Sequence, residues 1–316
     1  MITTTSVFAE EILEGLQQKP KRLFSKYFYD DIGDKLFQEI MKMDEYYLTR
    51  SEYEIFSQQK AQILRYIEQT NEPIQLIEFG AGDGLKTKLL LEYLLDKDVD
   101  FEYIPIDISA SVLDELQDDL KNKWPQLKCN PIASTYFDAL AELPSDKKKF
   151  VLFLGSNIGN FNSTEALQFI NQVNLHLNSG DYFLIGVDLK KDPQLILAAY
   201  NDKKGITKAF NLNLLTRINN ELGANFDTSA FDHFPTYDPI TGDTKSHLIS
   251  KREQDIYFSK LNETIHFNYA EPIFMEISKK YEIEELEKIA AQTNFKIEQH
   301  FFDCKHYYTN TLWKKQ

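Results

Sequence analysis

A glycine-rich turn after the apolar segment 74–79 carries the strongest chemical signal of the sequence. The run is Glu78-Phe-Gly-Ala-Gly-Asp-Gly84. Backbone without Cβ atoms can approach a ligand closely, and a helix that starts after the turn presents unpaired N–H groups. The spacing Gly-x-Gly-x-Gly differs from the Gly-x-Gly-x-x-Gly of dinucleotide-binding turns. An acid followed by a short glycine run fits S-adenosylmethionine better, because that ligand carries an aminoacyl group and no pyrophosphate.

Two more segments place polar groups directly after apolar runs. Asp107 ends the run 101–108, where its carboxylate can accept hydrogen bonds from ribose hydroxyls or cap the following helix. The segment Phe153-Leu-Gly-Ser-Asn-Ile-Gly-Asn160 sets Asn157 and Asn160 beside two glycines. Such a segment is either ordinary turn chemistry or a site for the groups of a methyl acceptor.

Aromatic residues gather in residues 24–50, among them Tyr29, Phe37 and Tyr46. Several tyrosines together suit a polar pocket wall, although packing in a core explains any single one equally well. Farther along, Glu276 and Ser278 have the spacing that faces one side of a strand. An acid and a hydroxyl there can hold a basic ring or belong to a solvated strand face.

Composition narrows the class of function. The chain has 316 residues, 42% of them hydrophobic, and a net charge of −14, which argues against binding nucleic acid through its phosphates. Cys129 and Cys304 have neither disulfide nor metal-ligand spacing. No apolar run is long enough to cross a membrane, and residues 1–5 lack the features of a signal peptide. We therefore expect a cytoplasmic protein, a monomer, with a small-molecule substrate, no metal and no membrane partner.

The apolar pattern predicts an α/β fold in the first two thirds of the chain. Apolar runs at 74–79, 101–108, 127–133, 150–155 and 182–189 alternate with helical stretches at 84–95, 109–120 and 163–177. This alternation is typical of a parallel sheet with right-handed crossovers. Two strand-like runs, 295–302 and 307–313, follow each other without a helix and must pair antiparallel. Five parallel strands and a terminal hairpin make the Rossmann-like seven-stranded sheet of class I methyltransferases, whereas a dinucleotide-binding fold would need a sixth helix-linked strand.

The ordered motifs resemble the histidine-specific Nα-methyltransferase family, which depends on S-adenosylmethionine and includes the enzyme of ergothioneine biosynthesis that makes trimethylhistidine. The resemblance covers nearly the whole chain. It rests on Tyr27-Phe-Tyr-Asp30, Glu45-Tyr-Tyr-Leu-Thr-Arg50, Phe79-Gly-Ala-Gly82, the segment 153–160, Asp188-Leu-Lys-Lys-Asp-Pro193, Ala198-Ala-Tyr-Asn201, Phe210-Asn211 and Met275-Glu-Ile-Ser278. It implies methylation of the histidine α-amine through to trimethylhistidine. It also implies a methyltransferase domain of residues 61–192 and 284–316 and a second, α+β substrate-binding domain of residues 1–60 and 193–283.

The resemblance implies a role for each residue of the substrate site. Asn160 and Tyr200 match the pair that binds the α-carboxylate, while Glu276 and Ser278 match the positions that hold the imidazole. Ser246 departs from the family, which often has a methionine packed on the imidazole there. This departure leaves another amino acid or amine, such as a decorated indole amino acid, open as the substrate. A protein that binds S-adenosylmethionine without catalysis is a further alternative.

The remaining implied residues lie around the amine and the cofactor. Near the α-amine and the methyl donor we expect Tyr46, Tyr29 and Phe37. Gly80, Lys86 and Asp107 match cofactor contacts of the family, and Thr135, followed by Tyr136, stands where the family usually has an acid against the adenine amine. With the glycine-rich segments, the predicted cofactor set is Glu78, Gly80, Gly82, Lys86, Asp107, Thr135, Tyr136 and Gly155.

Overall fold

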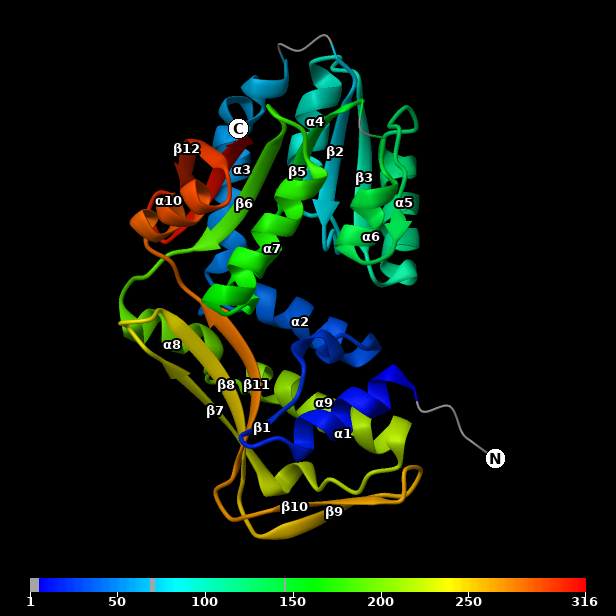
Figure 1. Cartoon of the computed structure of the whole chain (residues 1–316), viewed down its shortest axis with the longest axis vertical. Coiled ribbons are helices and arrows are strands. Elements are labelled where there is room, and N and C mark those ends of the chain that lie inside the picture. Colours follow the sequence, from blue (N-terminus) through cyan, green and yellow to red (C-terminus); the bar gives the residue numbers. More distant parts are fainter. Residues whose placement is uncertain (1–5, 69–71, 145) are drawn as a thin grey trace. The chain divides into compact units, whose positions relative to one another are not determined.

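The computed structural model of this protein describes residues 6–68, 72–144 and 146–316 (Figure 1). The chain divides into two compact units. Unit 1 consists of Met1–Tyr47 and Lys191–Ser278, and unit 2 of Leu48–Lys190 and Lys279–Gln316. Each unit is therefore built from segments that lie far apart in the sequence.

A seven-stranded sheet forms the centre of unit 2, in the order β12-β13-β6-β5-β2-β3-β4. The pairs from β4 to β6 are parallel, and β13 joins β6 and β12 antiparallel. This confirms the predicted α/β class and the class I methyltransferase sheet with its terminal hairpin. The strands are β2 (Ile74–Phe79), β3 (Phe101–Asp107), β4 (Ile132–Ala133), β5 (Lys148–Phe153), β6 (Tyr182–Asp188), β12 (Phe295–Phe302) and β13 (Tyr308–Lys315).

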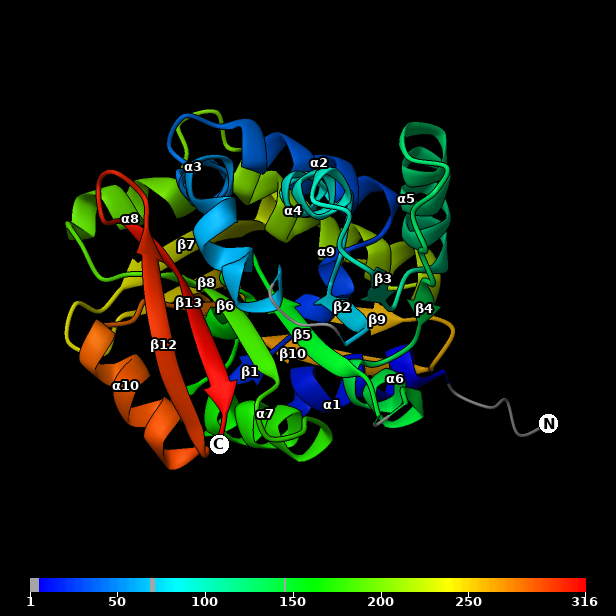
Figure 2. The same ribbon diagram turned by 90° about the horizontal axis from the view of Figure 1, so that it is seen from above.

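Helices cover both faces of this sheet. Figure 2 shows α3, α4 and α5 on one side and α6, α7 and α10 on the other. All residues of β2 are buried, because both of its faces lie under helices. The helices are α3 (Leu48–Glu68), α4 (Thr87–Asp96), α5 (Ala110–Lys123), α6 (Tyr136–Glu142), the 3₁₀ turn η2 (Asn157–Asn160), α7 (Ser163–His176) and α10 (Ile283–Gln292).

The third predicted strand differs most from the structure. The apolar run 127–133 forms the short strand β4, preceded by a single bridge between Tyr103 and Cys129. The short helix α6 follows at once, with Thr135 as its N-cap. The sequence pattern did not predict α6, because its seven residues are too few to show a helical period.

Unit 1 packs helices against a sheet of order β1-β11-β8-β7 and carries the hairpin β10-β9. Ile12 of α1, Leu214 of α9, Leu248 of β8 and Met275 of β11 belong to one apolar core. This arrangement is the α+β architecture expected for the second domain. The strands are β1 (Lys21–Arg22), β7 (Phe231–Tyr237), β8 (Asp243–Ser250), β9 (Gln254–Phe258), β10 (Glu263–Phe267) and β11 (Pro272–Lys279); the helices are α1 (Val7–Gln17), η1 (Ser25–Phe28), α2 (Asp31–Lys42), α8 (Pro193–Tyr200), α9 (Ile206–Leu222) and η3 (Thr228–Ala230).

The chain passes from one compact unit to the other after Tyr47, Lys190 and Ser278. The predicted domain boundaries lie after residues 60, 192 and 283. Helix α3 begins at Leu48 and packs on α4 and β13, so a boundary at 60 would cut one continuous helix of unit 2. After β11, Lys280 forms a fully buried ion pair of 2.9 Å with Asp188 of the same unit. The chain therefore enters unit 2 before residue 284.

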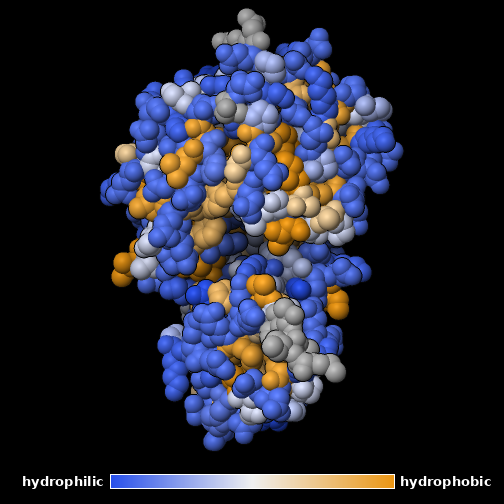
Figure 3. Space-filling model, turned by 45° about the vertical axis from the view of Figure 1, so that its right-hand side comes forward, coloured by the Kyte–Doolittle hydropathy of each residue, from blue (hydrophilic) through white to orange (hydrophobic). Residues whose placement is uncertain are grey.

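Hydrophilic side chains cover most of the face shown in Figure 3, with separate apolar groups between them. Large apolar side chains in solvent are scattered, for example Ile108 at 68% and Ile240 at 84% exposure. Among the described residues, no helix has the length and apolar character to cross a membrane. The inference about a signal peptide concerns residues 1–5, which lie outside the described residues.

Gly33 provides a test of the packing in unit 1. Its N–H donates to the N-cap residue Asp30 at 2.7 Å, and a Cβ atom here would overlap the carbonyl oxygen of Phe28. We expect Gly33→Ala to lower the free energy of unfolding by about 3 kcal/mol, because backbone must move to admit the methyl group. Gly205→Ala is the control: φ is +73° and no atom lies within 4 Å of the new Cβ. Its loss should be about 1 kcal/mol. Equal losses in urea unfolding would contradict the argument.

Candidate active site

The glycine-rich turn joins β2 to α4 in unit 2. Gly80, Gly82 and Gly84 have φ values of +67°, +52° and +62°, in the left-handed region that favours glycine. Gly80 donates its N–H to Ile106 at 2.8 Å, which ties the turn to β3. A Cβ atom on Gly82 would meet no heavy atom within 4 Å. The turn therefore presents bare backbone to open space at Gly82, a feature that suits a ligand-binding turn.

Tyr136 and Asp107 lie at the same edge of the sheet. The Tyr136 ring stacks on Phe79, with centroids 4.7 Å apart, and its hydroxyl lies 3.1 Å from the position of a Cβ on Gly80. Burial, and then the charge of Asp107, raises the pKa of Tyr136 to about 12, so its hydroxyl stays protonated. Asp107 Oδ1 accepts the N–H of Ser109 at 3.1 Å. Ser109 is itself the N-cap of α5, since its Oγ accepts the N–H of Val112 at 3.4 Å, so Asp107 holds the cap residue and does not cap the helix. The other lone pairs of its carboxylate are compatible with ribose hydroxyls.

The loop after β5 carries Gly155 and Asn157, which lie beside the glycine-rich turn. A Cβ on Gly155 would lie 3.7 Å from Lys86 Nζ and 3.8 Å from Asn157 Oδ1. A Cβ on Gly80 would lie 3.6 Å from Asn157 Nδ2. Ser156, between them, has a φ of +60°, a strained value of the kind that clusters at functional sites. Gly80, Lys86, Gly155 and Asn157 therefore form one polar cluster at the carboxyl ends of β2 and β5.

Thr135 precedes the short helix α6, and Asn160 is the last residue of the 3₁₀ turn η2. Thr135 Oγ1 donates to Asp138 Oδ2 at 2.6 Å and caps α6, so its hydroxyl hydrogen is engaged within the helix. Asn160 ends η2 and is half-buried. A Cβ on Gly159, just before it, would lie 2.7 Å from the carbonyl oxygen of Lys279, so the backbone of η2 packs directly on the last residue of β11.

Glu78 supports the glycine-rich turn from inside the core. Its carboxyl accepts a hydrogen bond from Thr87 Oγ1 at 2.6 Å and a second from the Tyr103 hydroxyl. Burial raises the pKa of Glu78 to about 7, against the opposing effect of these two hydroxyl donors. The side chain thus links β2, β3 and the start of α4, and its predicted contact with the cofactor stays a prediction.

In unit 1 the predicted aromatic residues form a continuous set, which we call the aromatic wall: Tyr29, Phe37, Tyr46 and Tyr200. Ring centroids are 5.6 Å apart for Tyr29 and Phe37, 6.5 Å for Phe37 and Tyr46, and 6.4 Å for Tyr46 and Tyr200. All three pairs are edge-to-face. Phe210 supports the wall at 5.8 Å from Tyr29 and 5.9 Å from Phe37. Sequence reasoning gave Phe210 no role, although it belongs to the matched pair Phe210-Asn211.

The Tyr200 hydroxyl connects the aromatic wall to β11. It donates to Ser278 Oγ at 2.8 Å, and both side chains are buried. Glu276, two residues earlier on the same strand, is half-buried. Ser246 lies on the neighbouring strand β8, 3% exposed, with its Oγ 3.5 Å from His233 Nε2. Burial lowers the pKa of His233 to about 4, so this imidazole is neutral at pH 7.

Among the residues that the structure describes, one group of potential metal ligands lies in unit 2. Atoms of Glu54, Asp303 and Cys304 lie within 4.8 Å of one another. Glu54 Oε1 accepts the N–H of Cys304 at 2.9 Å, and Asp303 Oδ1 accepts those of Tyr307 and Tyr308 at 2.7 and 2.8 Å. These bonds anchor the loop between β12 and β13, which accounts for the grouping. The spacing argument from sequence could not foresee it, because Glu54 lies on α3.

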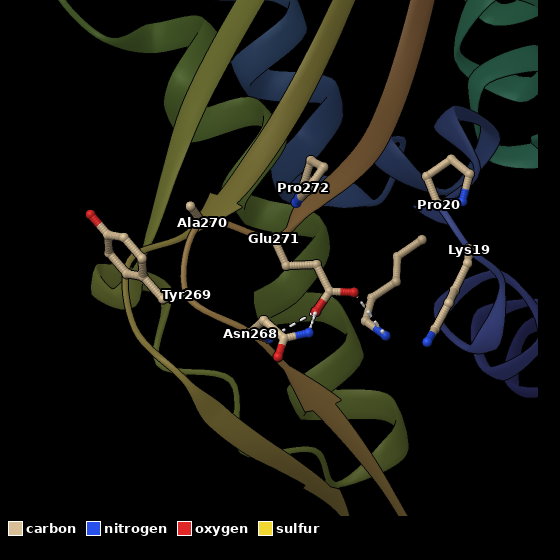
Figure 4. A pocket seen from close by; sticks show the side chains of 8 residues that line it. Lys19, Pro20, Asn268, Tyr269, Ala270, Glu271 and Pro272 are labelled. Atoms are coloured by element: carbon tan, nitrogen blue, oxygen red, sulfur yellow. Dashed lines mark hydrogen bonds and ion pairs between the residues drawn. The ribbon is translucent and has the colours of Figure 1, made fainter.

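A hollow of about 380 Å³ lies beside the turn between β10 and β11 in unit 1 (Figure 4). Lys21 Nζ and Glu271 Oε1 form an ion pair of 3.4 Å in its wall, and Glu271 Oε2 accepts the N–H of Asn268 at 2.8 Å. None of the predicted site residues lines this hollow.

The sequence matches the protein family described as histidine-specific, S-adenosylmethionine-dependent methyltransferase over residues 8–315. The histidine N-alpha-methyltransferase of Mycobacterium tuberculosis is 32% identical over 271 residues, which are 86% of this chain and 83% of that protein. Ergothioneine biosynthesis protein 1 of Schizosaccharomyces pombe is 29% identical over 311 residues, 94% of this chain and 40% of that protein. The 4-dimethylallyltryptophan N-methyltransferase of Claviceps purpurea is 26% identical over 303 residues, 89% of this chain and 87% of that protein.

The raised pKa of Glu78 predicts a pH dependence of stability. The folded carboxyl keeps its proton up to about pH 7, while the unfolded chain releases it near pH 4.5. The free energy of unfolding therefore falls as the pH rises through this window, by about 3 kcal/mol at most from this group. In Glu78→Gln this part of the decline should be absent, so the variant gains stability relative to the wild type as the pH rises.

Urea unfolding at several pH values between 4.5 and 7 measures this difference. Glu115→Gln, an exposed glutamate of α5, is the control and should follow the wild type throughout. A constant difference between the wild type and Glu78→Gln across the window would contradict the assignment.

Proposed function

Because this chain belongs to the family of histidine-specific, S-adenosylmethionine-dependent methyltransferases, we propose that it methylates the α-amine of histidine, through to trimethylhistidine. The observation that carries this proposal is the hydrogen bond of Tyr200 to Ser278, since it joins the aromatic wall to the strand that bears Glu276. An aromatic surface for a methylated amine and polar groups for an imidazole thus belong to one structure within unit 1.

The cofactor residues that we propose lie in unit 2. We propose that the bare backbone at Gly80 and Gly82 accommodates the ligand, and that Asp107 at the end of β3 accepts hydrogen bonds from the ribose hydroxyls. The ammonium of Lys86 suits the carboxylate of the aminoacyl end. Tyr136 forms a flat apolar surface beside the turn. When bound, S-adenosylmethionine supplies an electrophilic methyl group on a sulfonium centre.

For the substrate we propose roles that follow from the chemistry of each side chain. The carboxylate of Glu276 accepts a hydrogen bond from the imidazole, and Ser278 provides a hydroxyl on the same strand. Asn160 supplies an amide donor for the α-carboxylate. Tyr200 joins it by turning the hydroxyl hydrogen that it donates to Ser278 Oγ in this structure toward the ligand. Tyr46 contacts the α-amine, which must be neutral because an ammonium has no lone pair.

Repeated methylation sets a further requirement on the aromatic wall. Each round replaces an N–H group of the amine with a methyl group, which adds apolar volume. The methylated amine therefore donates fewer hydrogen bonds to the tyrosine hydroxyls than the unmethylated amine does. Tyr29, Phe37 and Tyr46 offer ring faces, which interact favourably with a quaternary ammonium. Catalysis by this chain then consists mainly of holding the amine about 3–3.5 Å from the methyl group. The proton of the amine leaves to water, either directly or through a tyrosine hydroxyl that passes one of its own protons on to water.

Ser246 favours a second candidate, an amino acid other than histidine. The small side chain leaves room where the resemblance implies a methionine, and one relative carries the name 4-dimethylallyltryptophan N-methyltransferase. Glu276 and Ser278 favour histidine, because an imidazole offers two ring nitrogens and an indole a single N–H donor. We further infer a cytoplasmic monomer that binds no nucleic acid, on the basis of two free cysteines and a net charge of −14.

Substrate identity is tested by calorimetric titration with histidine, dimethylhistidine and tryptophan in the presence of S-adenosylhomocysteine. We expect both histidine species to bind and tryptophan to bind much more weakly. Mass spectrometry of turnover should then show trimethylhistidine as the final product. Methylation of tryptophan alone would favour the second candidate, and absence of binding and turnover with every histidine species would overturn the proposal.

The role of Glu276 has its own test. We expect Glu276→Ala to raise the Kd of histidine about 10- to 100-fold, because a charge-assisted hydrogen bond contributes about 1.5–3 kcal/mol. The Kd of S-adenosylhomocysteine should stay unchanged. Glu263→Ala, an exposed glutamate of β10 in the same unit, is the matched control and should alter neither value. Wild-type affinity for histidine in Glu276→Ala would remove the imidazole assignment.

A further inference from the structure

Glu52 is a fully buried carboxylate to which neither the motifs nor the comparisons assign a role. It lies in the second turn of α3, with 0% of its surface exposed. Oε1 accepts hydrogen bonds from the Tyr308 hydroxyl at 3.0 Å and from Asn310 Nδ2 at 2.9 Å. Oε2 accepts the N–H of Gly155 at 2.9 Å and binds the ammonium of Lys86. Each oxygen thus accepts hydrogen bonds from two donors. A buried carboxylate requires such partners, because it has lost its contact with water.

The fold provides a slot for this side chain. A Cβ atom on Gly186 of β6 would overlap Glu52 Oε1 and the Tyr308 hydroxyl. Glycine at this strand position therefore lets the carboxylate pass close to the sheet backbone. The slot connects α3, β6 and β13 with the two segments that carry Lys86 and Gly155, all within unit 2.

The bonds of Oε2 hold two groups of the candidate cofactor cluster. The Lys86 side chain is 20% exposed while its partner Glu52 is 0% exposed, so a partly exposed lysine is held by a carboxylate of the interior. A free lysine side chain carries about 2 kcal/mol of rotamer entropy, which the ion pair removes before any ligand binds. Gly155, with its φ of +72°, is held by the same oxygen beside Lys86.

We propose that Glu52 is a positioning residue for the cofactor, which fixes the Lys86 ammonium and the Gly155 backbone for the carboxylate of the aminoacyl end. This inference rests on the proposed cofactor role of Lys86. The side chain acts through these two residues and touches no reacting atom. It also explains why α3, which contributes no residue to the glycine-rich turn, has a charged residue in its buried stripe with Leu48, Ile55 and Phe56.

Glu52→Gln is the informative variant, because it keeps the volume and removes only the charge. The amide oxygen can still accept the N–H of Gly155. The amide nitrogen can donate to Tyr308 or to Asn310 Oδ1, a buried atom with no hydrogen-bond partner among the described residues. We therefore expect a folded variant in which the ion pair with Lys86 is lost.

A double-mutant cycle with Lys86→Met, read out as the Kd of S-adenosylhomocysteine by calorimetry, tests the inference. We expect Glu52→Gln and Lys86→Met each to raise this Kd about tenfold, and the double variant to exceed Lys86→Met by less than twofold. In turnover, the KM for S-adenosylmethionine should rise in Glu52→Gln while the KM for histidine stays unchanged. A purely structural role would not produce this split.

Asp181→Asn is the matched control, since Asp181 is a buried carboxylate of unit 2 that accepts the N–H groups of Lys149 and Asn178 at 3.0 and 2.7 Å. It should lower the urea midpoint and leave the Kd unchanged. The inference is overturned if Glu52→Gln behaves in the same way, if the two variants of the cycle add independently, or if Lys86→Met leaves the Kd unchanged. A wild-type chain that binds no S-adenosylhomocysteine would instead overturn the proposed function.

Discussion

Two buried carboxylates, Glu52 and Glu78, hold the segments that surround the glycine-rich turn. Each is removed from water, where an ionised carboxylate is costly, so each depends on donors from neighbouring elements. Glu78 takes hydroxyls from β3 and from the start of α4, and Glu52 takes donors from β13, the loop after β5 and Lys86. The hydrogen bonds of Glu52 and Glu78 therefore help to fix the positions of the glycine-rich turn, of α4 and of the loop after β5. A buried ion pair contributes little net stability compared with apolar packing, which favours a role in geometry.

In unit 1, contacts between aromatic rings take the place of buried charges. Its aromatic wall is held by edge-to-face contacts and by one buried hydrogen bond, Tyr200 to Ser278. Rings with two rotatable bonds lose little entropy when a ligand binds, and they offer both apolar area and hydroxyls. Such a surface suits an amine whose polarity changes with each methyl group. The glycine-rich turn of unit 2 thus offers backbone geometry, and the aromatic wall of unit 1 offers side-chain surfaces.

Local patterns predicted much of unit 2, because parallel strands covered by helices produce continuous apolar runs. The strand runs, the terminal hairpin and the glycine-rich turn follow directly from them. The pattern failed at β4, where only two residues pair, and at α6, which is shorter than a readable helical period. Helix α3 continues past the predicted boundary after residue 60, because the sequence of a helix shows its period but not the unit against which the helix packs. Glu52 had a readable signal, a charge within the buried stripe of α3, whereas its four partner residues lie on three other segments.

The sequence by itself determined the sheet, the place of the cofactor turn and the family, since apolar periodicity, glycine spacing and ordered motifs are local properties of the chain. It also named the side chains Tyr29, Phe37, Tyr46, Tyr200 and Ser278. Only the tertiary structure decided that these five connect through ring contacts and one hydrogen bond, and that Phe210 supports them. The same holds for Glu52 and Lys86, which are 34 residues apart and meet because α3 packs beside α4. Contacts between distant segments depend on how helices and strands pack, and no local pattern of residues encodes that packing.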